Sequence, residues 1–228
     1  MSPATRSGAA AARRRARRAE IVKATRELFD ERGLRDANID DVARAVGVNR
    51  AIIYRHFASK DELFALTLAG YLEDLDGLLA AADDPGAPRP ERLAAAAGVL
   101  ADFGLRHPAF LDCSIDLMRQ PGAELLTELG EGALFRLGQL LAACLGRIAT
   151  VLPASPDGAD ADLRATTLYM QALGGLHLAR TGFYVRGGDP APQTVPVDEA
   201  TVRSLVVAAF VAGAQSTGGS AGADGEPV

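Results

Sequence analysis

The chain has 228 residues, which is enough for one or two domains with a sizeable core. Its composition, 48% hydrophobic and 23% charged, is ordinary for a soluble globular protein. The net charge of −5 excludes a protein that is basic throughout, but residues 1–60 hold 14 Lys and Arg against 7 Asp and Glu. Unless this clustering is chance, it indicates an N-terminal part that faces nucleic acid and a remainder with another task.

The N-terminal segment begins with a run of small residues that predicts a flexible stretch over residues 1–12. Helix formers dominate residues 13–32, and their apolar positions recur with helical spacing. Gly33 then predicts a left-handed cap that ends this helix. The apolar stripe consists of Ile21, Val22, Thr25, Leu28 and Phe29.

Two short helices are expected next, each opened by an asparagine. Asn38 can cap a helix whose apolar positions begin at Ile39, and Asn49 can cap a helix over residues 50–56. Gly47 lies between them, where a turn with positive φ is cheap only for Gly or Asn. A short helix, a glycine turn and a second short helix are the plan of a helix-turn-helix.

Helices continue to be expected along the rest of the chain. Ser59 and Glu62 have the spacing of a capping box, which opens a helix from residue 60 to about 82. Strand alternation is absent, so we expect an all-α protein of about nine helices. Further helices are predicted over residues 91–106, 108–119, 123–151, 163–185 and 199–214, with linkers at 83–90, 153–162 and 186–196.

The helix-turn-helix has an apolar seam and a polar outer face. Val42, Val46, Val48 and Ile53 form the seam, and Phe57 continues it as a core aromatic. The outward positions of the second helix would enter the major groove of DNA, where an arginine can donate two hydrogen bonds to guanine. These positions are Asn49, Arg50, Ala51, Tyr54 and Arg55.

Three side chains are expected to reach phosphate. Tyr54 and His56 can contact phosphate oxygens, and Lys60 adds charge to a helix N-terminus that already favours an anion. The alternative for Tyr54 is a core role, and a charged helix face can also be merely solvated. We expect the DNA role for Tyr54 because it is offset from the apolar seam.

Residues 21–68 resemble the DNA-binding domain of the TetR family, the tetracycline-repressor-like regulators. The matching pieces are "ATRELFDERGL", "IDDVARAVGV" and "YRHFASKDEL". Asn38 departs from the usual Thr, but it caps a helix equally well, so only a modest change in its phosphate contact is expected. The helices beyond residue 76 resemble the family in length and layout.

The resemblance implies an all-α homodimer whose C-terminal domain binds a small molecule and whose DNA-binding domain represses transcription until that molecule binds. It implies that Tyr54, His56 and Lys60 touch the DNA backbone and that Arg50 reads bases. A DNA-binding protein without a ligand is the alternative. An arginine run at residues 13–18 could lie along the backbone, insert in a minor groove, or only solubilise the start of a helix.

The last two helices are expected to form a four-helix interface between two chains, as the resembling family implies. One carries a stripe of small residues and the other an apolar face. The alternative is that both are core helices of a monomer. The predicted interface residues are Ala172, Gly175, Ala179, Gly182, Val202, Val206 and Phe210.

A ligand pocket is expected on the middle helices, and few charged residues interrupt their apolar faces. A largely hydrophobic, uncharged ligand follows from that composition. Taken singly, each candidate lining residue is better explained by core packing than by ligand contact. The candidates are Phe103, Phe110, Leu117, Met118, Phe135, Tyr169, Met170 and His177.

An enzyme is the competing class, and the sequence offers no motif for one. The three histidines do not pair with Cys, Ser or a carboxylate at a motif spacing, and no phosphate loop, HExxH or nucleophile elbow occurs. We expect no catalysis, no metal and no cofactor. Cys113 and Cys144 are predicted to be reduced core residues.

We also expect no secretory signal, no apolar stretch near the ~20 residues of a membrane span, and a cytoplasmic protein. The predicted domains are a flexible basic arm (1–15), a helix-turn-helix domain (16–65), a ligand-binding and dimerisation domain (66–214) and a disordered tail (215–228).

Overall fold

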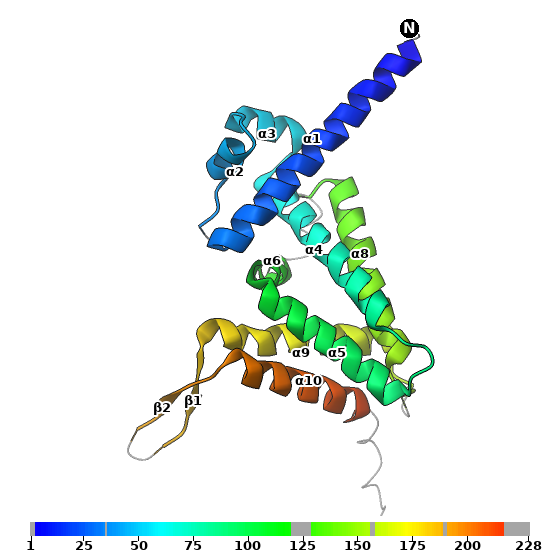
Figure 1. The fold of residues 1–228 in the computed structure, drawn as a ribbon, viewed down its shortest axis with the longest axis vertical. Coiled ribbons are helices and arrows are strands. Elements are labelled where there is room, and N and C mark those ends of the chain that lie inside the picture. The colour runs from blue at the N-terminus through cyan, green and yellow to red at the C-terminus, as the bar shows by residue number, and fades with distance from the viewer. Residues whose placement is uncertain (1–2, 35, 120–128, 156–157, 189–190, 217–228) are drawn as a thin grey trace, which may run out of the picture. The chain divides into compact units, whose positions relative to one another are not determined.

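The computed structural model describes residues 3–34, 36–119, 129–155, 158–188 and 191–216, and these form nine helices and one short hairpin (Figure 1). The all-α prediction is confirmed. The start of the helix predicted over 123–151 and nearly all of the predicted tail lie outside the described residues. The helices are α1 (Pro3–Arg32), α2 (Ile39–Ala45), α3 (Arg50–His56), α4 (Lys60–Ala82), α5 (Arg89–Arg106), α6 (Pro108–Arg119), α8 (Glu131–Val151), α9 (Ala161–Thr181) and α10 (Glu199–Ser216).

The chain forms two compact units that alternate along the sequence. The first unit holds residues 1–74 and 107–141, and the second holds residues 75–106 and 142–228. Two helices, α4 and α8, therefore contribute residues to both units. The predicted linear boundary at residues 65 and 66 stays a prediction.

In the first unit, α1 packs against α2, α3 and α6. Ile21 and Phe29 of α1 are almost fully buried, and Phe29 packs edge-on against the ring of Phe64 on α4. Tyr71 of α4 donates a hydrogen bond of 2.7 Å to Asp30 of α1. Burial, followed by this bond, raises the pKa of Tyr71 well above its usual range, so its hydroxyl stays a donor.

In the second unit, α10 packs against α9 and α5, and α5 also packs against α9. The guanidinium of Arg203 on α10 donates two hydrogen bonds, 2.5 and 2.8 Å, to Asp102 on α5, and these bonds lower the pKa of that carboxyl. Arg164 of α9 is buried and donates to the carbonyls of Pro153 and Ala214. These contacts hold the C-terminal helix within the unit.

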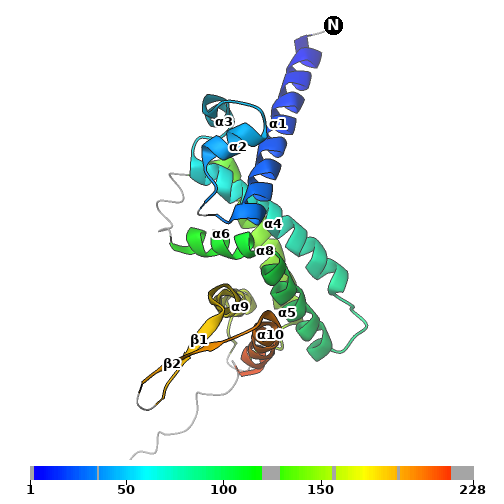
Figure 2. The same cartoon turned by 60° about the vertical axis from the view of Figure 1, so that its left-hand side comes forward.

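Three expectations about secondary structure were wrong. The helix α1 begins at Pro3 and not near residue 13, because the Ala-rich and Arg-rich run consists of strong helix formers. The helix α9 ends at Thr181, because Gly182 adopts a left-handed cap with φ of 71°. The linker beyond it contains the antiparallel strands β1 (Phe183–Arg186) and β2 (Gln193–Pro196), which project beyond the helices of their unit (Figure 2).

The two cysteines are buried thiols outside any disulfide, as the sequence predicts. Burial raises the pKa of Cys144 to about 12 and raises that of Cys113 as well. The expectation about membrane spans was wrong in one respect, because α8 is long and apolar enough to cross a membrane by length and composition alone. Core helices of soluble proteins and signal sequences meet the same criterion.

Candidate nucleic-acid interface

The helix-turn-helix, residues 39–56, forms as the sequence predicts. Asn38 caps α2 by accepting a hydrogen bond from the amide of Asp41, and Asn49 caps α3 by accepting one from Ile52. Gly47 has a φ of 67°, which only a residue without a Cβ adopts readily. These caps fix where each short helix begins and ends, and therefore which side chains of α3 face outward.

The seam between α2 and α3 is closed. Val42 and Ile53 are almost fully buried, and Val46 and Val48 are half-buried. Phe57 is buried directly after α3, which confirms it as a core aromatic. A buried seam on one side leaves the opposite face of α3 to solvent.

The exposed face of α3 carries the side chains predicted to meet DNA. Arg50 donates a hydrogen bond of 3.3 Å to the Tyr54 hydroxyl and lies 3.7 Å from a carboxylate oxygen of Asp40. The hydrogen bond, and then these charges, raise the pKa of Arg50, so the arginine is fully cationic. Of the eight predicted DNA contacts, His56 is half-buried and the other seven are exposed: Asn38, Asn49, Arg50, Ala51, Tyr54, Arg55 and Lys60.

Lys60 begins α4 beside the end of α3. Its ammonium lies 4.7 Å from the centre of the Phe64 ring. Ser59 caps α4 by accepting a hydrogen bond from the amide of Glu62. The Glu62 carboxylate in turn accepts from the amide of Ala58, 2.5 Å away.

Arginines of α1 complete this surface, and the sequence did not identify which ones. Arg18 donates to the carbonyl of His56 and, at 2.8 Å, to the carboxylate of Glu62, and its guanidinium covers the Phe57 ring. Arg17 donates to the carbonyl of Val46 at 3.3 Å. Helical register counted from the apolar stripe of α1 could have shown that these two arginines face the helix-turn-helix.

His56 lies near these arginines, where a second proton on its imidazole ring is unfavourable. Its Nδ1 is buried, and no hydrogen bond to it exists among the residues that the structure describes. Burial lowers the pKa of His56, and the charges of Arg14, Arg18 and Arg17 lower it further. The imidazole is therefore neutral at pH 7, in a strongly positive surrounding that favours an anion.

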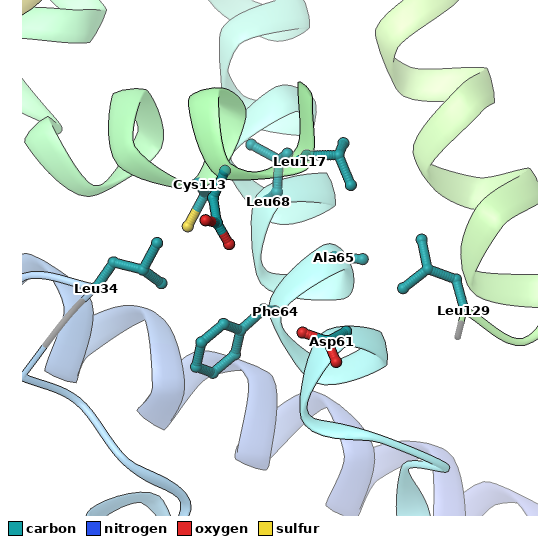
Figure 3. A pocket seen from close by; sticks show the side chains of 9 residues that line it. Leu34, Asp61, Phe64, Ala65, Leu68, Cys113, Leu117 and Leu129 are labelled. Carbon is teal, nitrogen blue, oxygen red and sulfur yellow. The ribbon is translucent and has the colours of Figure 1, made fainter. Parts of the chain in front are cut away.

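The residues predicted to line a ligand pocket do not gather at one place. Phe103, Phe110 and Tyr169 are buried core residues, while Met118, Phe135, Met170 and His177 are exposed. Leu117 lines a cavity of the first unit with a volume of only about 20 Å³, between α4, α6 and the segment after α1 (Figure 3). That cavity is bounded by Leu34, Asp61, Phe64, Ala65, Leu68, Cys113, Asp116 and Leu129.

Five of the seven predicted interface residues do come together. They line a cavity of about 140 Å³ between α9 and α10, whose rim includes the exposed side chains Leu178 and Leu205. Ala179 is half-buried outside this cavity, and Gly182 lies beyond the helix as its cap. The five residues are Ala172, Gly175, Val202, Val206 and Phe210.

Much of the apolar face of α10 packs against other helices of the same chain. Val202, Val206 and Phe210 are nearly buried without a partner chain, and a Cβ added at Gly175 would lie 2.8 Å from a methyl group of Val206. In the described part of the chain, no three His, Cys, Asp or Glu side chains are grouped to hold a metal.

Comparison with known proteins agrees with this geometry. Residues 21–67 match the family model described as "Bacterial regulatory proteins, tetR family". The transcriptional repressor KstR2 of Rhodococcus jostii is 41% identical over 61 residues, 27% of this chain and 30% of that protein. The transcriptional activator FasR of Mycolicibacterium smegmatis is 32% identical over 87 residues, 38% of this chain and 40% of that protein.

The chain thus matches less than half the length of either regulator. The similarity in fold extends further: the transcriptional regulator FadR of Bacillus subtilis, solved with stearoyl-CoA, superposes with a TM-score of 0.57 over 85% of this chain and 97% of that one, at 14% identity. The family model covers the helix-turn-helix described above, and the fold extends beyond it. The helix-turn-helix domain of this chain belongs to the TetR family of bacterial regulatory proteins.

Proposed function

We propose that the protein is a cytoplasmic transcriptional regulator that binds duplex DNA through α3 and acts as a repressor released by a small hydrophobic molecule. The observation that carries the DNA-binding part is the exposed row of α3, with Arg50 and Tyr54 on a helix whose other face is buried. Arg50 would read bases, while Tyr54, His56 and Lys60 would hold phosphate.

A dimer follows from the size of the motif, because one recognition helix reads too few base pairs for specificity. Two copies related by a two-fold axis would bind half-sites about one helical turn apart, ~34–36 Å, or a multiple of that spacing. The cavity between α9 and α10 supports this part of the proposal, since Leu178 and Leu205 remain exposed on its rim. An apolar strip of this kind is suited to packing against its own copy.

The experiment for DNA binding compares affinities at one fixed salt concentration. Genomic fragments retained by the full chain are sequenced, and the dissociation constant of the best fragment is measured beside that of an unrelated duplex of equal length. A specific regulator binds its site roughly 10³–10⁷ times more tightly than other DNA. A ratio below about ten would contradict the proposal.

Release by a ligand is the finer part of the proposal. The two DNA-bound helices must match the groove spacing, so a modest change in their separation loses one half-site. The helix α4 is the proposed lever, since it contributes Leu63 and Phe64 to the first unit and Leu75, Leu78 and Leu79 to the second. A hydrophobic ligand is proposed because few charged residues interrupt the apolar faces of the middle helices.

Reciprocal titration tests this switch. Thermal shift with a panel of apolar compounds finds a binder, whose affinity is then measured with and without the selected DNA fragment. Coupling between the two sites must act equally in both directions, so the fragment should weaken the compound by the same factor, about 5- to 150-fold. Equal affinities would contradict release by that compound, and a compound that tightens DNA binding would indicate a co-repressor.

A further inference from the structure

The N-terminal part of α1 extends past the helix-turn-helix as a regular helix. Figures 1 and 2 both show α1 continuing well beyond α2 and α3 toward the N-terminus. This part carries Arg13, Arg14 and Arg15, all of them exposed. The helix-turn-helix itself does not require these residues, so they call for a separate explanation.

The helical register places Arg14 on the face that meets the helix-turn-helix. Side chains three and four residues apart lie on the same face of a helix. Arg14 stands four residues before Arg18 and three before Arg17, and both of these arginines contact the motif or the turn that follows it. Arg14 therefore lies one turn further along the same face.

Arg14 differs from these two neighbours in its charge partners. Arg17 forms an ion pair of 2.7 Å with Glu20, and Arg18 forms one of 2.8 Å with Glu62. No carboxylate among the described residues pairs with Arg14, and its side chain is exposed. Its charge nevertheless reaches His56, whose pKa it lowers more than either Arg17 or Arg18 does.

The shape of the segment decides between two ways of binding DNA. An α-helix with its side chains is about 10–12 Å across, whereas the minor groove of B-DNA is about 6 Å wide. Because residues 13–18 are helical here, the segment cannot enter the minor groove as an extended arm would. Guanidinium groups on such a helix can instead meet the phosphates that border the groove.

We propose that Arg14 is a DNA-backbone contact outside the helix-turn-helix, extending the phosphate-binding surface of Tyr54, His56 and Lys60. The proposal rests on the proposed DNA-binding function. It assigns Arg14 an affinity role that is independent of base sequence, since a phosphate contact releases counterions and reads no base edge.

The test is the salt dependence of DNA binding by the full chain. The variant Arg14→Ala is compared with Lys23→Ala, which removes one positive charge from the same helix, nine residues away and therefore on the opposite face. For Arg14→Ala, the slope of log K against log salt should fall by about 0.9 for each protomer bound, and affinity should weaken for the preferred and unrelated duplexes alike. Lys23→Ala should keep the wild-type slope.

Two additional measurements keep the result decisive. Arg14→Lys retains the charge and should restore most of the slope, while circular dichroism checks that each variant folds. A slope for Arg14→Ala equal to that of wild type or of Lys23→Ala would overturn the assignment of Arg14 while leaving the helix-turn-helix function intact. A wild-type protein without measurable DNA affinity would instead overturn the proposed function, and the role of Arg14 with it.

Discussion

Arg18 and Glu62, which stand 44 residues apart in the sequence, form an ion pair of 2.8 Å that joins α1 to the first turn of α4. The same arginine donates to the carbonyl of His56, and the same carboxylate accepts from the amide of Ala58. Together these bonds fix the end of α3 and the start of α4 against α1. The pair therefore positions the phosphate-binding residues His56 and Lys60.

Breaking this pair should destabilise the first unit. Arg18→Ala leaves the carboxylate of Glu62, only 10% exposed, without its cation, which should cost about 1–3 kcal/mol in the free energy of unfolding. A double-mutant cycle with Glu62→Gln, measured by urea unfolding, isolates the coupling. The exposed pair of Lys23 and Glu27 is the control and should couple by less than about 0.5 kcal/mol. Equal coupling in both cycles would contradict this account of Arg18.

His56 should make the protein less stable in mild acid. Its folded pKa lies below the unfolded value of about 6.5, so the unfolded chain takes up the proton first and stability falls as pH drops through that range. Burial of the ring lowers this pKa most, and the charges of Arg14, Arg18 and Arg17 lower it further. The nearby carboxylate of Glu62 is already paired with Arg18.

The measurement is the free energy of unfolding at several pH values for wild type and His56→Gln. The variant should remove part of the pH dependence below about 6.5, at most about 1.4 kcal/mol per pH unit for one proton. An unchanged slope in His56→Gln would show that this imidazole titrates alike in both states.

Adjacent glycines of α9 should respond to alanine in opposite directions. Nothing lies within 4 Å of a Cβ added at Gly174, so Gly174→Ala should stabilise the helix by about 0.5–1 kcal/mol. At Gly175 the added Cβ would lie 2.8 Å from the stiff side chain of Val206, and overpacking should make this variant about 1–3 kcal/mol less stable than Gly174→Ala. Thermal or urea unfolding ranks the two variants, and equal stabilities would show that α9 and α10 move apart freely.

The proposed dimer should depend on Leu205. This side chain is 57% exposed on the rim of the cavity between α9 and α10. Leu205→Glu therefore places a charge at the proposed interface without disturbing the core of one chain. Sedimentation at micromolar concentration should give a monomer for this variant and a dimer for wild type. Ser204→Glu, about 100° around the same helix, should remain dimeric. Dimers in both variants would place the interface elsewhere.

Sequence patterns predicted the local features of the DNA-binding unit because a few neighbouring residues determine them. Asn38, Gly47 and Asn49 each act within one turn of the backbone, so their caps and turn could be predicted without any tertiary contact. The partners of Arg18 could not, because 38 and 44 residues separate it from His56 and Glu62.

The second unit shows a different limit. The small-residue stripe that includes Gly175 predicts close approach of another helix, and the structure shows α10 of the same chain there. The stripe alone does not say whether the partner is intramolecular. The residues predicted to contact a ligand do not share one pocket, for a similar reason. Apolar periodicity identifies Phe103 and Tyr169 as inward-facing, but it does not show whether a cavity adjoins them.

The most direct test of the central claim, sequence-specific DNA binding through α3, is selection of bound duplexes from a random pool by wild type and by Arg50→Ala. Wild type should enrich an inverted repeat with half-sites about one helical turn apart, or a multiple of it. Arg50→Ala should lose preference at one base pair in each half-site and weaken that site by about 1–3 kcal/mol per half-site. If wild type enriched no repeat, or if Arg50→Ala enriched the same sequence with the same affinity, α3 would not be the recognition helix.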